Sequence, residues 1–251
     1  MYRQDIIDTL KSQAIRITSK DPITLYIKSE ANQICDLGNK VQNCLVDINN
    51  ALNGNAILTS QVMNNSKDLL RNLIPEEWSN IWDGPEIPLN YIKSLGKKIN
   101  GMINYIKGIK GDNLLNATNI NLSEFLHPEA FINALRQKSA REMKIPIDEL
   151  EIECYFNKPD NGVFSNITGL FLQGADFDGK KLIDISGNKS EIVQMPLCHF
   201  KFSKGKVQQK DEIGIPLYEN LFREHFICSL GLKFQGDLDT VILKGIALCL
   251  D

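Results

Sequence analysis

Long apolar runs are missing from this sequence, because no stretch approaches the roughly 18–20 apolar residues of a membrane helix. Residues 1–21 also lack the apolar core of a signal peptide, so we expect a cytoplasmic protein with no membrane partner. A basic excess is missing too: the net charge is -3, which is not typical of nucleic-acid-binding proteins. What is present is 43% hydrophobic residues, enough to bury a core and to exclude global disorder.

Motifs that indicate chemistry are also absent. The sequence has no GxxxxGK[ST] phosphate loop, no dinucleotide-binding fingerprint and no GxSxG nucleophile elbow. Its six cysteines include no CxxC pair, so we expect reduced, buried thiols and no metal or other cofactor. A zinc set of Cys198, His199, His225 and Cys228 is the alternative. Adjacent residues of a strand point to opposite faces, which disfavours it.

The first clear helix is long. Asp21 and Pro22 are typical of a helix start, and apolar residues then recur every three or four positions up to Leu52. The predicted helix has about 30 residues and spans roughly 45 Å. Because the remaining helical part is too small to cover that length, we expect the segment from Tyr2 to Ile27 to lack full packing partners within these residues. Its apolar residues, Leu10 and Ile17 among them, would then be exposed, frayed or buried by a neighbouring copy.

Three further helices are predicted over residues 59–73, from Pro88, and from Pro128 with Phe131, Ala134 and Leu135 inward. Trp78 and Trp82, four residues apart, line a ligand groove or wedge a helix junction into the core, which is the commoner role. Five lysines form a solvated helix face or meet an acidic surface. They are Lys93, Lys97, Lys98, Lys107 and Lys110.

From Glu151 the apolar period changes to two, and six or seven short strands are predicted. Residues 163–174 form one long strand with a glycine inside, and residues 240–250 form a closing strand. The predicted fold class is α+β, with a helical subdomain over residues 1–146 and a small antiparallel β-barrel over residues 147–251. Between two strands, Asp176 and Asp178 form either a paired acid site or, as their glycine neighbours favour, a turn.

Six segments, in order, carry a family resemblance: DPITLYIKSEANQI (21–34), ALNGNAILTSQV (51–62), IPEEW (74–78), FLHPEAFINALRQKSARE (125–142), GLFLQGADFDG (169–179) and LKGIALCL (243–250). Together they resemble the C-terminal region of dynein heavy chains over nearly the whole sequence. Within that family the sequence looks most like the retrograde intraflagellar-transport cytoplasmic dynein heavy chain.

The resemblance implies that Met1 begins a fragment of a longer polypeptide and that the fragment is a regulatory and structural domain. The fragment would pack on the AAA+ ring of the same heavy chain, which is its expected partner. ATP hydrolysis and microtubule binding would occur elsewhere in the parent motor, on the cytoskeleton and in a cilium or flagellum, so no catalytic residue is expected here. The motif and candidate interface residues are Leu10, Ile17, Trp78, Phe131, Arg136, Gly169, Gly174, Asp176 and Asp178.

Two other functions remain open from the residues alone. One is an enzyme with an unfamiliar site in the barrel, which convergent titratable groups with shifted pKa values would indicate. The other is an independent β-barrel that binds a partner or ligand without any motor role. An exposed apolar stripe on the long first helix would favour the motor domain over both.

Overall fold

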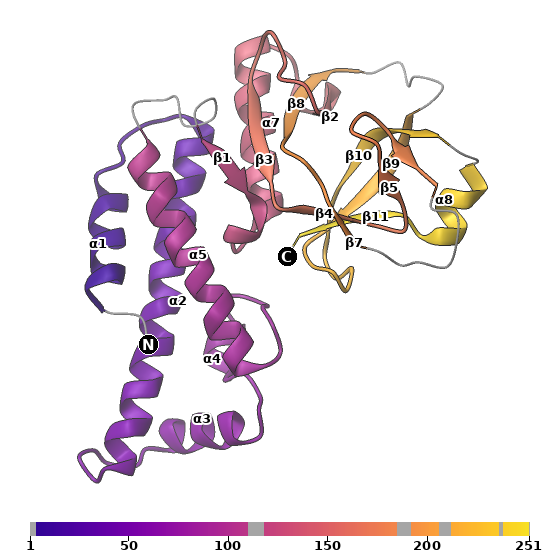
Figure 1. The fold of residues 1–251 in the computed structure, drawn as a ribbon. Coiled ribbons are helices and arrows are strands. Elements are labelled where there is room, and N and C mark those ends of the chain that lie inside the picture. Colours follow the sequence, from indigo (N-terminus) through magenta and orange to yellow (C-terminus); the bar gives the residue numbers. More distant parts are fainter. Residues whose placement is uncertain (1–3, 110–117, 185–191, 206–211, 236–237, 251) are drawn as a thin grey trace. The chain divides into compact units, whose positions relative to one another are not determined.

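The computed structural model describes residues 4–109, 118–184, 192–205, 212–235 and 238–250 (Figure 1). The protein divides into two compact units, each described by itself. The helical unit comprises Met1–Ser19 and Ile27–Lys107, and the sheet unit comprises Lys20–Tyr26 and Gly108–Asp251.

The long predicted helix is confirmed and has 31 residues. A side-chain oxygen of Asp21 accepts a hydrogen bond from the Thr24 backbone N–H at 3.1 Å, as an N-cap residue does. The first turn of this helix groups with the sheet unit and the remainder with the helical unit. The helices of the N-terminal part are α1 (Gln4–Ile15), α2 (Pro22–Leu52), α3 (Ser60–Leu70), α4 (Glu76–Ser79) and α5 (Pro88–Gly108).

Helix α1 packs along α2, so the expectation that the N-terminal segment lacks packing partners was wrong. Leu10 is fully buried and Ile17 is buried, so neither is exposed as the length argument predicted. Gly38 of α2 lets α1 approach closely, because a Cβ at that position would lie 3.1 Å from a methyl carbon of Ile7. The Nζ of Lys28 also donates to the Ile17 carbonyl at 2.8 Å. The length argument failed because it did not allow for a second helix packed along the first.

Truncating Leu10 tests this packing. We expect Leu10→Ala to lower the free energy of unfolding by about 2–5 kcal/mol, because it leaves a cavity between α1 and α2. The matched control is Ile15→Ala, on the exposed side of α1, with an expected change of about 0.5 kcal/mol or less. Urea denaturation measures both. Equal, small losses would mean that α1 is not part of the core.

The two tryptophans lie in the core of the helical unit. The Tyr91 ring lies 5.9 Å from Trp78 and 4.8 Å from Trp82, between centroids, and its hydroxyl reaches both tryptophan carbonyls at 3.1 Å. The interpretation as a core wedge is therefore confirmed. Lys98 is also buried, with Nζ 4.7 Å above the Trp82 ring, so its placement on a solvated face was wrong. Lys93, Lys97 and Lys107 are exposed, and Lys110 lies outside the described residues.

The sheet unit contains a mixed sheet of 11 strands (Figure 1). Its strands are β1 (Asn119–Asn121), β2 (Leu150–Tyr155), β3 (Phe164–Thr168), β4 (Leu170–Gln173), β5 (Asp176–Phe177), β6 (Leu182–Ile183), β7 (Ile192–Gln194), β8 (Cys198–Lys204), β9 (Glu212–Tyr218), β10 (Phe226–Gln235) and β11 (Ala247–Leu250). Its helices are α7 (Pro128–Met143), α8 (Leu238–Lys244) and two 3-10 turns, Leu122–Glu124 and Ile147–Glu149.

The α+β class is confirmed, but the antiparallel barrel is not. The strand order is β1-β3-β8-β2-β10-β9-β11-β4-β7, and within the described residues this path is open. Four neighbouring pairs are parallel, namely β1 with β3, β10 with β2, β10 with β6, and β11 with β9. Alternation in the sequence reports which residues share a face, but it does not report the direction of the neighbouring strand.

Two predicted strands are divided. Residues 163–174 form β3 and β4, separated by Gly169 with φ +76°, and the two halves join different neighbours. Residues 240–250 were expected to be one strand, but they contain the end of α8 and then β11. Gly245, with φ +56°, separates these two elements. Positive φ angles are readily adopted only by glycine, so both breaks occur where the backbone is free to turn.

Helix α7 packs on the sheet, with Phe131, Ala134 and Leu135 buried as predicted. Phe131 stacks on Phe125 at 5.3 Å, and the Nη2 of Arg136 donates to the Leu150 carbonyl at 2.7 Å. Secondary structure changes after α7, near the predicted subdomain boundary of 146/147. The compact units divide differently, because residues 108–146 group with the sheet.

Candidate functional site

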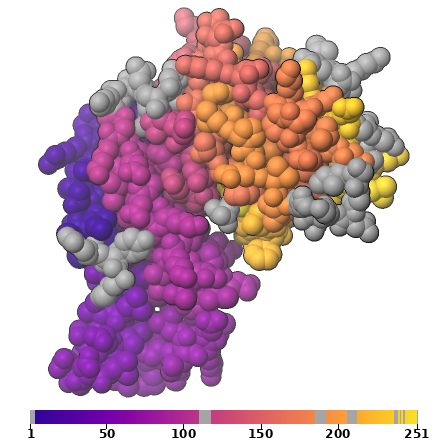
Figure 2. Space-filling model, viewed as in Figure 1, coloured from indigo at the N-terminus to yellow at the C-terminus, as the bar shows by residue number. Residues whose placement is uncertain are grey.

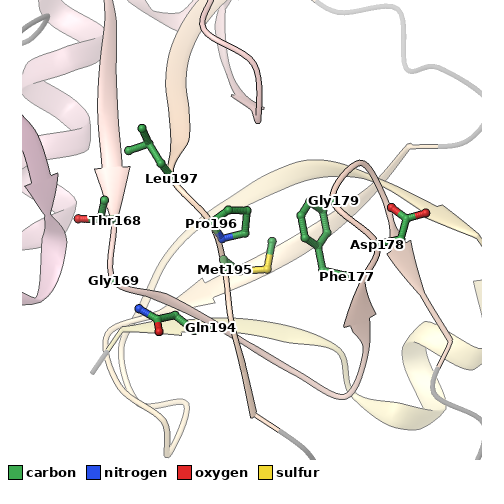
Figure 3. Close-up of a pocket in the computed structure, with 9 residues that line it drawn as sticks. All are labelled: Thr168, Gly169, Phe177, Asp178, Gly179, Gln194, Met195, Pro196 and Leu197. Carbon is green, nitrogen blue, oxygen red and sulfur yellow. The ribbon is translucent and has the colours of Figure 1, made fainter.

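An open groove of about 720 Å³ lies in the sheet unit (Figure 3). It brings together two of the motif residues, Gly169 from the β3–β4 corner and Asp178 from the β5–β6 turn. Its other lining residues are Thr168, Phe177, Gly179, Gln194, Met195, Pro196 and Leu197. Asp178 is the only ionisable side chain in this lining, so the groove offers no acid–base pair.

The Asp178 carboxylate serves the turn. One oxygen accepts hydrogen bonds from the backbone N–H groups of Lys180 and Lys181 at 2.8 and 2.9 Å. These bonds hold the pKa of the carboxyl below its usual value. A side-chain oxygen of Asp176 accepts from the Phe177 N–H at 2.7 Å. The turn interpretation is therefore confirmed, and both carboxylates have backbone partners.

The two motif glycines are required by close packing. A Cβ on Gly169 would lie 2.3 Å from the side-chain oxygen of Asn121. A Cβ on Gly174, whose φ is +81°, would lie 3.0 Å from the Lys244 carbonyl oxygen. The glycines thus shape the sheet around the groove, and they carry no chemistry of their own.

Gly169→Ala tests the corner. Backbone strain at positive φ and the clash with Asn121 should together lower the free energy of unfolding by about 2–4 kcal/mol. Gly179→Ala is a matched control, because Gly179 also has positive φ but its Cβ would meet no atom within 4 Å.

Gly179→Ala introduces only the backbone strain, so it should lower the free energy of unfolding by about 1–2 kcal/mol. Urea denaturation of both variants gives the difference that belongs to the contact with Asn121. Equal losses would contradict the packing described for the β3–β4 corner.

The thiols whose pKa is shifted are not activated. Burial raises the pKa of Cys35 to about 12, of Cys44 to about 11 and of Cys228 to about 12. A hydrogen bond with Cys154, followed by burial, raises the pKa of Cys198. All six thiols are free, and they are protonated where the pKa is raised, so they are poor nucleophiles and poor metal ligands at neutral pH. Within the described ranges no group of three or more acidic, histidine or cysteine side chains is arranged to hold a metal ion.

His199, from the alternative zinc set, is buried as a neutral ring. Burial and the charge of Lys158 lower its pKa, and its Nδ1 lies 2.9 Å from the side-chain oxygen of Asn166. Phe164 meets the ring edge-on at 5.6 Å. The residues that surround His199 thus hold it in the core of the sheet unit.

Helix α3 has an unusual orientation: its single buried side chain is Asn65. The Nδ2 of Asn65 donates to one carboxylate oxygen of Glu77 at 2.7 Å, and the Nε2 of Gln61 donates to the other at 2.9 Å. Asn65 also reaches the Cys44 sulfur at 3.3 Å. The side of α3 that carries Asn65 therefore faces the helical unit, with Val62 and Leu69 half-buried beside it.

On the opposite side of α3, Met63 and Leu70 are exposed beside Lys67, and several apolar residues that flank the helix are exposed as well. Ile57 and Leu70 are each 87% exposed and Leu52 is 82% exposed. We call this surface the apolar corner. It consists of Leu52, Ile57, Leu58, Met63, Leu70 and Leu73. It extends from the end of α2 along α3 to the residues just after it, the purple segment in Figure 2.

Sequence reasoning missed the apolar corner and favoured other residues. Leu10, Ile17, Trp78 and Phe131 are buried inside their own units, and Arg136 binds a carbonyl within the sheet unit. The signal for the corner was present in the apolar pair Ile57–Leu58 just before α3 and in Leu70 at its end, since the middle of this helix is polar.

Residues 3–250 match the family model for the C-terminal domain of dynein heavy chains. The protein belongs to this family. The domain is 30% identical over 241 residues to cytoplasmic dynein 2 heavy chain 1 of Tripneustes gratilla, covering 94% of the domain and 6% of that heavy chain. The human protein of the same name is 27% identical over 235 residues, with 91% and 5% covered. Human dynein axonemal heavy chain 9 is 23% identical over 248 residues, with 94% and 5% covered.

The domain thus spans only about one-twentieth of the length of these curated relatives, at 5–6%. Within the described residues, no helix combines the length and the apolar character that crossing a bilayer requires. The described site residues form an exposed apolar surface and a groove, with no assembled catalytic constellation among them.

Proposed function

We propose that this protein is the C-terminal structural and regulatory domain of a dynein heavy chain, and that it docks on the AAA+ ring of the same heavy chain through the apolar corner. Family membership supports the first statement. The exposed apolar residues on and beside α3 support the second, since Asn65 on the inward side already has partners whereas Met63 and Leu70 face water.

The energetics favour an occupant for this corner. The burial of one large aliphatic residue contributes about 1.5–3 kcal/mol, and the corner contains six such residues. Exposed apolar residues gathered along one stretch of the surface are typical of protein–protein contacts. A domain docked through this corner regulates the ring only if its contacts differ between ring states. Equal contacts in every state would leave the equilibrium between those states unchanged.

The relatives support a finer identity. Several curated relatives are cytoplasmic dynein 2 heavy chains, so we assign the parent to that class and to retrograde intraflagellar transport in a cilium or flagellum. In this proposal the parent is an ATP-dependent motor. Microtubules and ATP are engaged by other parts of the heavy chain.

A double substitution in the corner tests the proposal. Ile57→Gln with Leu70→Gln removes apolar surface while keeping a good helix former at the α3 position. In the isolated domain the free energy of unfolding should change by about 1 kcal/mol or less, because both residues are exposed. In the full heavy chain the same pair should alter microtubule-stimulated ATPase and gliding velocity several-fold.

Ile15→Gln is the matched control, since Ile15 is an exposed aliphatic residue at the end of α1, away from the corner (Figure 1). It should leave the full motor unchanged. A normal motor with the double substitution contradicts docking through the corner. A strongly destabilised isolated domain would instead mean that Ile57 and Leu70 belong to its own core.

The groove favours a second candidate function, an independent module that binds a ligand or partner. Its apolar lining fits one protruding apolar side chain better than a charged metabolite. The two candidates separate in the isolated domain, because only the second needs a ligand that binds there without the rest of a motor.

A further inference from the structure

The loop between β9 and β10, residues 219–225, is held in one shape by its own hydrogen bonds. The side-chain oxygen of Asn220 accepts from the backbone N–H groups of Phe222 and Glu224, and its Nδ2 donates to the Glu224 carboxylate at 2.7 Å. The Glu219 N–H bonds the carbonyls of Glu224 and His225. Backbone hydrogen bonds thus join the two ends of the loop, and the Asn220 side chain holds its middle in place.

The sheet fixes the loop from a second side. The Nε of Arg223 donates to the side-chain oxygen of Gln173 at 2.9 Å, and the Nε2 of Gln173 donates to the Leu221 carbonyl at 3.0 Å. Arg223 and His225 both have positive φ, 64° and 49°. Non-glycine residues rarely adopt this region, so the surrounding bonds hold the backbone in a conformation that it would otherwise leave.

This rigid loop presents one large apolar side chain to water. Phe222 is 87% exposed, and the two residues that follow it, Arg223 and Glu224, are exposed as well. A single exposed aromatic residue needs no explanation in general. An aromatic residue on a pre-ordered loop is different, because binding through it requires little further loss of conformational entropy. Aromatic anchors of this kind are enriched among residues that dominate binding.

We infer that the 219–225 loop inserts Phe222 into an apolar socket on the part of the same heavy chain that lies outside these 251 residues. This inference rests on the proposed function, which supplies that longer polypeptide. The surface area that the loop can bury favours a socket in the same heavy chain over a separate partner. Seven residues cannot bury the roughly 1,200 Å² that stable complexes between free proteins need. Within one polypeptide the effective concentration is on the order of millimolar, and a single anchor suffices.

Hydrogen exchange on the full heavy chain and on the isolated 251-residue domain tests the inference. The N–H groups of residues 219–225 should exchange about tenfold more slowly in the full heavy chain, because docking opposes loop opening. Phe222→Ala in the full heavy chain should return them to the rate of the isolated domain. Leu243→Ala is the matched control, an equally exposed apolar residue of the same unit on α8, and it should leave the protection intact.

Three other outcomes would overturn the inference, each in a distinct way. Protection of the apolar corner without protection of the loop would reject the socket and leave the proposed function standing. Protection of neither surface would reject both. A concentration-dependent dimer of the isolated domain that Phe222→Ala abolishes would show that a second copy supplies the socket, in place of the heavy chain.

Discussion

The carboxylate of Glu77 fixes the orientation of α3, and the functional account depends on that orientation. Its two oxygens accept hydrogen bonds from Gln61 and Asn65, one turn apart on the helix. Hydrogen bonds to a charged group contribute about 1.5–3 kcal/mol each, more than typical neutral ones. These bonds hold the side of α3 that carries Asn65 against the helical unit, and Leu70 and Met63, on the other side, face water. Turning the helix to bury them would expose the half-buried residues of its present inward side.

The sheet unit uses glycines and backbone-directed side chains in a similar way. Gly169 lets one continuous segment serve two separate parts of the sheet, and Asp178 closes the next turn by accepting backbone N–H groups. Asn220 does the same for the β9–β10 loop. These polar groups have their hydrogen bonds satisfied locally, so they shape surfaces and leave no strongly activated group for catalysis.

Much of the helical part was predictable from its sequence, because Asp21 and Pro22 mark a start and the apolar period of α2 is regular. The packing of α1 against α2 was not predictable. It depends on the missing side chain of Gly38, which leaves room for Ile7 only when the two helices lie side by side. Parallel strand pairing could not be predicted from the sequence either, because apolar residues alternate along a strand in the same way whether its neighbour is parallel or antiparallel. The apolar corner was missed for a similar reason: which side of α3 faces inward depends on hydrogen bonds to Glu77, which belongs to another helix.

The central claim is that the apolar corner is covered by the same heavy chain. The most direct measurement is an electron cryomicroscopy structure of the full heavy chain in two nucleotide states. The account predicts that Ile57 and Leu70 are buried against ring modules in at least one state, with contacts that differ between the two. Corner residues that face solvent in both states would contradict it.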